Sequence, residues 1–186
     1  MRTAIVVLAL SIPAHARADV TWGVGLRSSA QALRAVDADT DSALAGGGLQ
    51  VRFRFGRAWG LEVSAEELHG TAGDGAYRRE ACPVTVTGSY HFDLGAVDLY
   101  LLAGIGGTKD EVSYVDANGM TVDEEVEESH VHLGVGVEHL FGPVGLAAEL
   151  RAIATWRRDA DTAMPYAAVP PRSAGAQVNL IGTYYF

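Results

Sequence analysis

The sequence predicts an all-β fold, an eight-stranded antiparallel up-and-down transmembrane β-barrel. Three observations predict it. Apolar residues recur at every second position in eight successive segments, which is the period of a strand with two different faces. The connections between these segments alternate between short and long. Arginines and glutamates share the segments with the aliphatic residues, but lie on the opposite face.

The N-terminus has the parts of a secretory signal peptide. Met1 and Arg2 precede an apolar stretch from Ala4 to Ile12, and the small-residue site Ala16-Arg17-Ala18 follows. This stretch of nine residues is too short to cross a hydrocarbon core of about 30 Å as a helix. We therefore expect residues 1–18 to be a signal peptide and residues 19–186 to form the exported β-barrel domain.

The first four segments alternate clearly. Their apolar faces consist of Val20, Trp22, Val24 and Leu26; Leu49, Val51, Phe53 and Phe55; Leu61, Val63 and Ala65; and Val84, Val86, Tyr90 and Phe92. Each segment approaches the 9–11 residues that a tilted strand needs to cross a membrane.

The second four segments continue the period. Their apolar faces consist of Val97, Leu99, Leu101, Ala103 and Ile105; Val131, Leu133, Val135 and Val137; Val144, Leu146, Ala148, Leu150, Ala152, Ala154 and Trp156; and Ala176, Val178, Leu180, Tyr184 and Phe186. The even number of segments suits an antiparallel barrel that closes on itself.

The connections fall into two classes of length. The short ones are Gly56–Gly60, Asp93–Ala96 and Gly142-Pro143, and the long ones are approximately Ala35–Ser42, Gly73–Arg79, Lys109–Glu128 and Arg157–Ser173. Short turns at one end and long polar loops at the other are typical of transmembrane β-barrels.

The charged face is predicted to line the lumen and the aliphatic face to contact lipid. An eight-stranded barrel is just wide enough inside for side chains, and glycines at 104, 106, 134 and 136 leave room for long ones. Arginine is suited to buried pairing with carboxylates. We therefore expect a structural ion-pair network of Arg52, Arg54, Glu62, Glu66, Glu138, Glu149 and Arg151.

Aromatic residues are expected at both membrane interfaces. Phe55, Trp59, Phe92, Phe141, Tyr184 and Phe186 fall at the short-turn end, and Tyr77, Trp156 and Tyr166 fall toward the long-loop end.

Two places break the regular alternation of apolar and polar residues. We expect a bulge at Glu66-Glu67 that keeps both acids inward and turns Leu68 outward. We expect a second bulge or irregular stretch near the Asn118-Gly119 turn signal.

The mature chain resembles the small eight-stranded outer-membrane barrels of Gram-negative bacteria, the OmpA-transmembrane-domain and OmpX-like family. The most specific element is the C-terminus, where Val178, Leu180, Tyr184 and terminal Phe186 recur at period 2. The resemblance implies that Tyr184 and Phe186 belong to a signal read by the barrel-assembly machinery. It also implies a cell outer membrane location, contact with outer-membrane lipid and lipopolysaccharide, and a monomer.

Other candidate chemistry is weaker. His130 and His132 lie on one face of a segment, and Glu138 lies further along it. No third ligand has the sequence spacing that is diagnostic of a zinc site. Ser129 and His130 are neighbours on a strand and so point to opposite faces. The acidic stretch Lys109–Glu128 lacks the spacing of a calcium loop, and Cys82, the single cysteine, is expected near a strand start. We expect no enzyme activity, cofactor or metal.

The sequence supports a structural or loop-presenting role, with the lumen plugged by Arg–Glu pairs. The alternatives are a narrow channel for small solutes and, with less support, a lipocalin-like soluble periplasmic carrier with inward aliphatic residues. The formal net charge of −9 disfavours nucleic acid as a partner.

Overall fold

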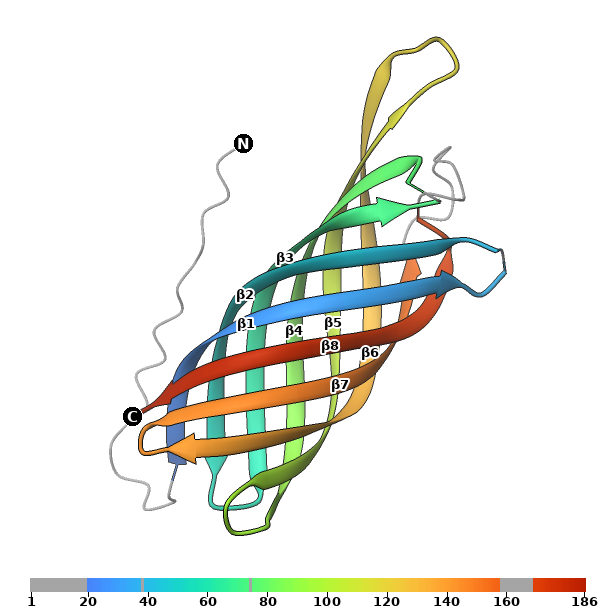
Figure 1. Ribbon diagram of the computed structural model, residues 1–186. Coiled ribbons are helices and arrows are strands. Elements are labelled where there is room, and N and C mark those ends of the chain that lie inside the picture. Colours follow the sequence, from blue (N-terminus) through green and yellow to red (C-terminus); the bar gives the residue numbers. More distant parts are fainter. Residues whose placement is uncertain (1–19, 38, 74, 158–168) are drawn as a thin grey trace.

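The computed structural model describes residues 20–37, 39–73, 75–157 and 169–186. They form one closed barrel of eight strands in which each strand pairs with its neighbours in sequence and β8 returns to β1 (Figure 1). The strands are β1 Val20–Ala35, β2 Asp41–Phe55, β3 Trp59–Ala72, β4 Tyr77–Asp93, β5 Asp98–Val115, β6 Thr121–Phe141, β7 Val144–Arg157 and β8 Arg172–Tyr185. The predicted fold is confirmed. The predicted signal peptide lies outside the described residues.

All neighbouring strands are antiparallel, and the barrel closes where β1 runs along β8 from Gly23 opposite Tyr185 to Ala35 opposite Ser173. Closure matters because an open sheet edge cannot satisfy its backbone hydrogen bonds in lipid. The described residues contain no helix that is long and apolar enough to cross a membrane.

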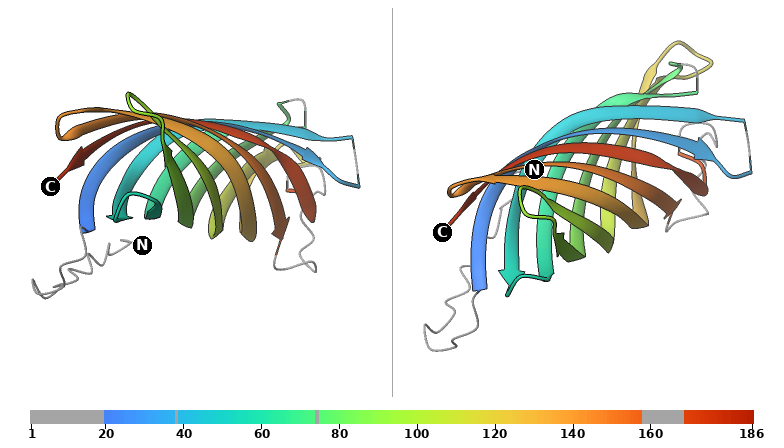
Figure 2. Two further views of the ribbon diagram at one scale, coloured as in Figure 1. Left: turned by 90° about the horizontal axis from the view of Figure 1, so that it is seen from below. Right: turned by 60° about the horizontal axis from the view of Figure 1, so that its bottom comes forward.

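Three of the four connections predicted to be long are shorter than expected, and the fourth, Arg157–Ser173, lies mostly outside the described residues. The three short turns are residues 56–58, 94–97 and 142–143, and they lie at the end where the chain terminates (Figure 1). At the other end, residues 36–40, 73–76 and 116–120 are shorter than expected because the strands continue into the predicted loops. The β5–β6 hairpin projects beyond the other strands at this end (Figures 1 and 2).

The stretch predicted as a long acidic loop is therefore mainly strand. β5 extends to Val115 and β6 begins at Thr121, so the connection is the turn Asp116–Met120. The N–H of Asp116 donates to the carbonyl of Met120 at 2.8 Å, and Gly119 has φ +79°, which glycine adopts without strain. The irregularity expected here is confined to this turn, while the register along β5 and β6 stays regular.

The bulge expected at Glu66-Glu67 is absent from the described strands. Glu66 is opposite Gly48 and Glu67 is opposite Gly47 in an unbroken β2–β3 register. Glu66 and Leu68 consequently both face inward, at 7% and 1% exposed, and Glu67 faces outward. The prediction erred because it treated an acid on the outer wall as too costly; the position lies above the aliphatic part of β3.

The outer surface carries the aliphatic residues, which confirms the predicted direction of the two faces. Leu26, Leu133 and Leu180 are 66%, 67% and 62% exposed, whereas the polar residues next to them, Arg27, His132 and Asn179, are buried. Exposed leucines in a continuous band make sense only where lipid replaces water as the surrounding solvent.

Aromatic residues gather on the short-turn end as predicted. Trp22 stacks on Phe186 with 4.4 Å between ring centroids, and Trp59 contacts Tyr90 edge-on at 5.0 Å. The opposite girdle was predicted less well. Trp156 is exposed, but Tyr77 packs with Tyr114 against an internal apolar cluster, and Tyr166 lies outside the described residues.

A charged plug in the barrel lumen as the candidate functional site

The lower part of the lumen, toward the short turns, contains a network of buried charges. Period-2 alternation brings arginines and carboxylates from several strands to the barrel axis. All seven residues predicted from the sequence are in it, and Arg27 and Asp98 join them. We call this set the lower network: Arg27, Arg52, Arg54, Arg151, Glu62, Glu66, Glu138, Glu149 and Asp98.

Two glutamates form the centre of the lower network, and both contact the same three arginines. Glu62 on β3 accepts from Arg27 at 3.0 Å, Arg52 at 2.6 Å and Arg151 at 3.1 Å. Glu149 on β7 lies 3.0 Å from Arg27, 3.2 Å from Arg52 and 2.6 Å from Arg151. These arginines come from β1, β2 and β7, so the contacts bridge the lumen from several sides.

The end of this network near the short turns is formed around Arg54 and Glu138. Arg54 donates to Asp98 at 2.7 Å and also to Glu138. The Tyr185 hydroxyl donates to Glu138 at 2.7 Å, and that of Tyr100 donates to Glu149 at 2.8 Å. The neutral donors matter because a buried carboxylate needs more than one partner to offset its desolvation.

Glycines in the wall provide the space for these side chains, as the sequence predicted. A Cβ at Gly136 would overlap the ring of Tyr100, and a Cβ at Gly106 would overlap the ring of His130. The large lumen side chains therefore lie directly over small residues on the adjacent strand.

A second, smaller set of charges lies higher in the lumen. We call it the upper network: Arg79 on β4, Asp110 on β5 and Glu128 on β6. Arg79 lies 3.0 Å from Asp110 and also donates to Glu128. Above it lies an apolar cluster of the buried residues Val112, Val126 and Val169. A cavity of about 20 Å³ separates the two networks, which is room for about one water molecule.

The set predicted from the sequence does not include Arg27, Asp98 or the upper network. Arg27 lies on the predicted inward face of its segment, so its position in the alternation was enough to predict it as a lumen residue. Arg79, Asp110 and Glu128 lie in or at the edge of stretches predicted to be loops, in which no strand alternation is expected. Extending the period-2 pattern through those stretches would have found them.

The other candidate residues do not assemble into a site. His132 contacts Thr87 at 3.0 Å and His130 contacts Thr108 at 3.3 Å, while Glu138 is held by Arg52, Arg54 and Tyr185. Ser129 and His130 are consecutive in β6 and face opposite sides of the wall. Cys82 lies within β4, exposed on the outer surface, and not at a strand start as expected.

A closed antiparallel barrel with aliphatic residues outside and paired charges inside defines an integral β-barrel membrane protein. The chain belongs to the family described as outer membrane protein beta-barrel domain, whose model matches residues 3–161. The protein is accordingly located in the outer membrane, and the predicted family resemblance is confirmed.

Solved structures of outer-membrane barrels share the fold. Neisserial surface protein A superposes with a TM-score of 0.61 at 15% identity, covering 89% of this chain and 97% of that one. A major outer membrane protein from Thermus thermophilus gives 0.57 at 13% identity, with 89% and 99% covered. Ail of Yersinia pestis gives 0.51 at 16% identity, with 89% and 98% covered. No curated protein matches this chain in sequence.

Proposed function

We propose that this protein is a closed barrel that anchors and presents its extracellular hairpin and loops and does not conduct solutes. The observation that carries the proposal is the shared set of arginines on Glu62 and Glu149. Because these contacts cross the lumen and every member is buried or half-buried, a solute would have to break several charge-assisted hydrogen bonds to pass.

The β5–β6 hairpin is the element best placed for presentation. Its strands are 18 and 21 residues long, the two longest in the barrel. In bacterial outer-membrane barrels the short turns are periplasmic and the longer connections extracellular, so the hairpin extends outside the cell. Asp116 stabilises its tip, because the N–H groups of Met120 and Asn118 donate to its carboxylate, which holds the pKa of Asp116 below its usual value.

The charge of this hairpin distinguishes the surface from one that binds polyanions. The structure of Ail has been solved with the heparin analogue sucrose octasulfate. Here the hairpin has many more acids than bases, including Glu111, Asp123, Glu125 and Glu127, and Lys109 is paired with Glu125 at 2.6 Å. A sulfated partner would be repelled, so a cationic or neutral partner fits this surface better.

Conductance of the purified barrel in planar bilayers tests the closed lumen. We expect the wild-type barrel to show no stepwise current, because the lower network fills the lumen. Arg52→Ala shortens one bridging side chain, and we expect short openings in that variant. Arg57→Ala, in an exposed short turn, is the control and should stay silent. Steady unit currents through the wild-type barrel would favour the narrow channel instead.

Labelling of intact cells tests the presentation of the hairpin. In a Cys82→Ser background, a cysteine at Met120, which is 59% exposed at the hairpin tip, should react with a membrane-impermeant maleimide. A cysteine at Arg57, in a turn at the other end, should react only after the cells are broken. The opposite result would mean that the hairpin is periplasmic.

The partners that follow from this role are outer-membrane lipid and lipopolysaccharide around the aliphatic band, and the barrel-assembly machinery during biogenesis. Tyr184 and Phe186 are exposed at the β8–β1 seam, and the Phe186 N–H donates to the Trp22 carbonyl at 2.9 Å. Phe186→Ala should lower the level of barrel in the outer membrane more than Phe141→Ala, an exposed aromatic at the same end. Catalysis forms no part of the proposal, since Ser129 and His130 face opposite sides.

A further inference from the structure

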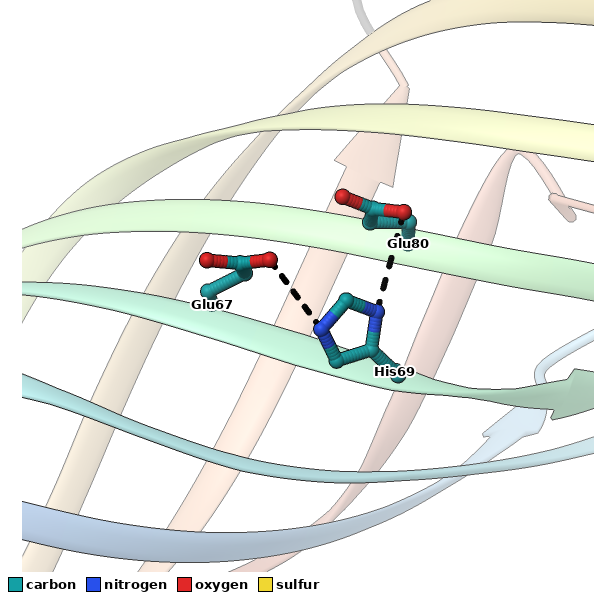
Figure 3. A group of neighbouring side chains, drawn as sticks. All are labelled: Glu67, His69 and Glu80. Atoms are coloured by element: carbon teal, nitrogen blue, oxygen red, sulfur yellow. Dashed lines mark ion pairs between the residues drawn. The ribbon is translucent and has the colours of Figure 1, made fainter.

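The outer wall carries a polar cluster that plays no part in the lumen networks. Glu67 and His69 lie two residues apart on β3, and Glu80 lies on β4; all three side chains point away from the barrel axis and toward one another (Figure 3). Residues on this face below them are aliphatic, including Val63 and Val84, which are 41% and 54% exposed. The cluster therefore lies at the upper rim of the lipid-facing band.

Strand pairing holds the three side chains in place. His69 is directly opposite Glu80 in the β3–β4 register, and Glu67 precedes His69 on the same face because side chains alternate along a strand. The imidazole Nε2 lies 3.1 Å from Glu67 Oε1, and Nδ1 lies 3.7 Å from Glu80 Oε2. One potential ligand atom from each residue lies within 4.8 Å of the other two.

Two carboxylates at the edge of an apolar surface need a positive charge to offset their desolvation and mutual repulsion. One imidazole between them supplies at most a single charge. The nearest outward positions toward the membrane, Ala65 and Cys82, supply none, and Lys109, opposite Cys82 on β5, is paired with Glu125. Toward the loops, the exposed Arg78 shares the outward face of β4 with Glu80, but among the described residues the ion pairs of this cluster join only His69 to the two glutamates. A divalent cation would neutralise both carboxylates at once.

We propose that Glu67, His69 and Glu80 bind a divalent transition-metal ion of the Zn²⁺ class. One imidazole nitrogen and two carboxylate oxygens form a donor set that suits Zn²⁺, whereas Mg²⁺ and Ca²⁺ prefer oxygen alone. Tetrahedral coordination at these bond lengths places ligand atoms about 3.4 Å apart. In the structure Glu67 contacts Nε2 and Glu80 contacts Nδ1, so the side chains must rotate until one nitrogen faces both carboxylates. They are 48%, 61% and 44% exposed for His69, Glu67 and Glu80, which leaves room for that rotation and for water at a fourth position.

This site is separate from the lumen plug because the strand wall lies between them. Glu66 and Glu67 are consecutive, but Glu66 accepts a hydrogen bond from Ser29 and forms an ion pair with Arg27 inside the barrel, whereas Glu67 contacts His69 outside. Substitutions of the outward residues can therefore change metal binding without disturbing the closed lumen.

Calorimetric titration of the purified, metal-free barrel with ZnCl₂ tests the proposal. We expect one equivalent to bind, with at least a 10-fold loss of affinity in His69→Ala and in the isosteric variants Glu67→Gln and Glu80→Gln. MgCl₂ should not compete at the same concentration. Each variant is checked for the gel-mobility shift of a folded barrel, so that loss of binding is not confused with loss of folding.

Three control variants locate the metal. His139→Ala removes a partly exposed histidine at the short-turn end, Glu125→Gln removes a carboxylate of the acidic hairpin, and Cys82→Ser removes the outward thiol of β4. All three should bind Zn²⁺ as the wild type does. Unchanged affinity in His69→Ala, or loss of binding in any control variant, would overturn the assignment of these three ligands.

Discussion

The lower and upper networks of the lumen hold their charges in different ways. In the lower network Glu62 and Glu149 each contact three arginines, so every central carboxylate has several cations. In the upper network, among the described residues, Arg79 alone contacts both Asp110 and Glu128. Near the short turns, several arginines neutralise each central carboxylate. Near the loops, a single arginine neutralises two carboxylates.

The two networks should therefore respond differently to substitution. Removing one partner of a buried ion pair is costly mainly because the other partner is left buried without compensation. In the lower network the remaining arginines still contact the same carboxylates. In the upper network the loss of Arg79 leaves two like charges facing each other, so the smaller network should be the more sensitive one.

The largest effect is expected for Arg79→Met. The side chain is almost fully buried, and its loss leaves Asp110 and Glu128 without their cation, which should cost about 3–5 kcal/mol. The measurement is the urea midpoint of the barrel in lipid vesicles. Arg78→Met, at the adjacent outward position, should change the free energy of unfolding by less than about 0.5 kcal/mol. Equal effects of the two variants would contradict the structure.

A smaller effect is expected for Arg151→Met. Glu62 and Glu149 keep Arg27 and Arg52 after this substitution, so we expect a loss of about 1.5–3 kcal/mol, the range for hydrogen bonds to charged groups. The same urea titration measures it. If Arg151→Met destabilised the barrel as much as Arg79→Met does, the redundancy of the lower network would be wrong.

The pair Glu66→Gln and Glu67→Gln compares the two sides of one wall. Glu66 is buried and contacts Ser29 and Arg27, so its substitution should cost about 1 kcal/mol. Glu67 faces outward, so its substitution should change stability in a chelating buffer by less than about 0.5 kcal/mol. A bulge that turned both acids inward would make the two costs similar.

The smallest effect is expected at the hairpin tip. Asp116→Ala removes the acceptor for the N–H groups of Met120 and Asn118. These hydrogen bonds lower the pKa of Asp116, so they stabilise the turn above the ordinary pKa of aspartate and are lost as the pH falls through the lowered value. Amide exchange of the turn should be faster in the variant at neutral pH and equal to wild type in acid, with the urea midpoint unchanged.

Much of the fold and of the lower network was predictable because strand periodicity is local. Val24, Leu26 and Arg27 are enough to assign the two faces of β1, and the same logic placed Arg52, Glu62 and Glu149 inside. At Glu66-Glu67 a bulge was predicted in place of regular alternation, and this prediction is wrong because the β2–β3 register is continuous there. The strand simply continues past the aliphatic band, and an outward acid is acceptable there.

Alternation and turn residues involve neighbouring positions, so the number of strands, their order, the direction of each face and the family could be predicted without a structure. The contacts inside and outside the barrel wall could not. Register brings Glu62 and Glu149 to the same three arginines, places Arg79 between two acids from other strands, and sets His69 opposite Glu80. These contacts join residues far apart in the chain, and their distances depend on how strands shift along one another when the barrel closes, which no local pattern specifies.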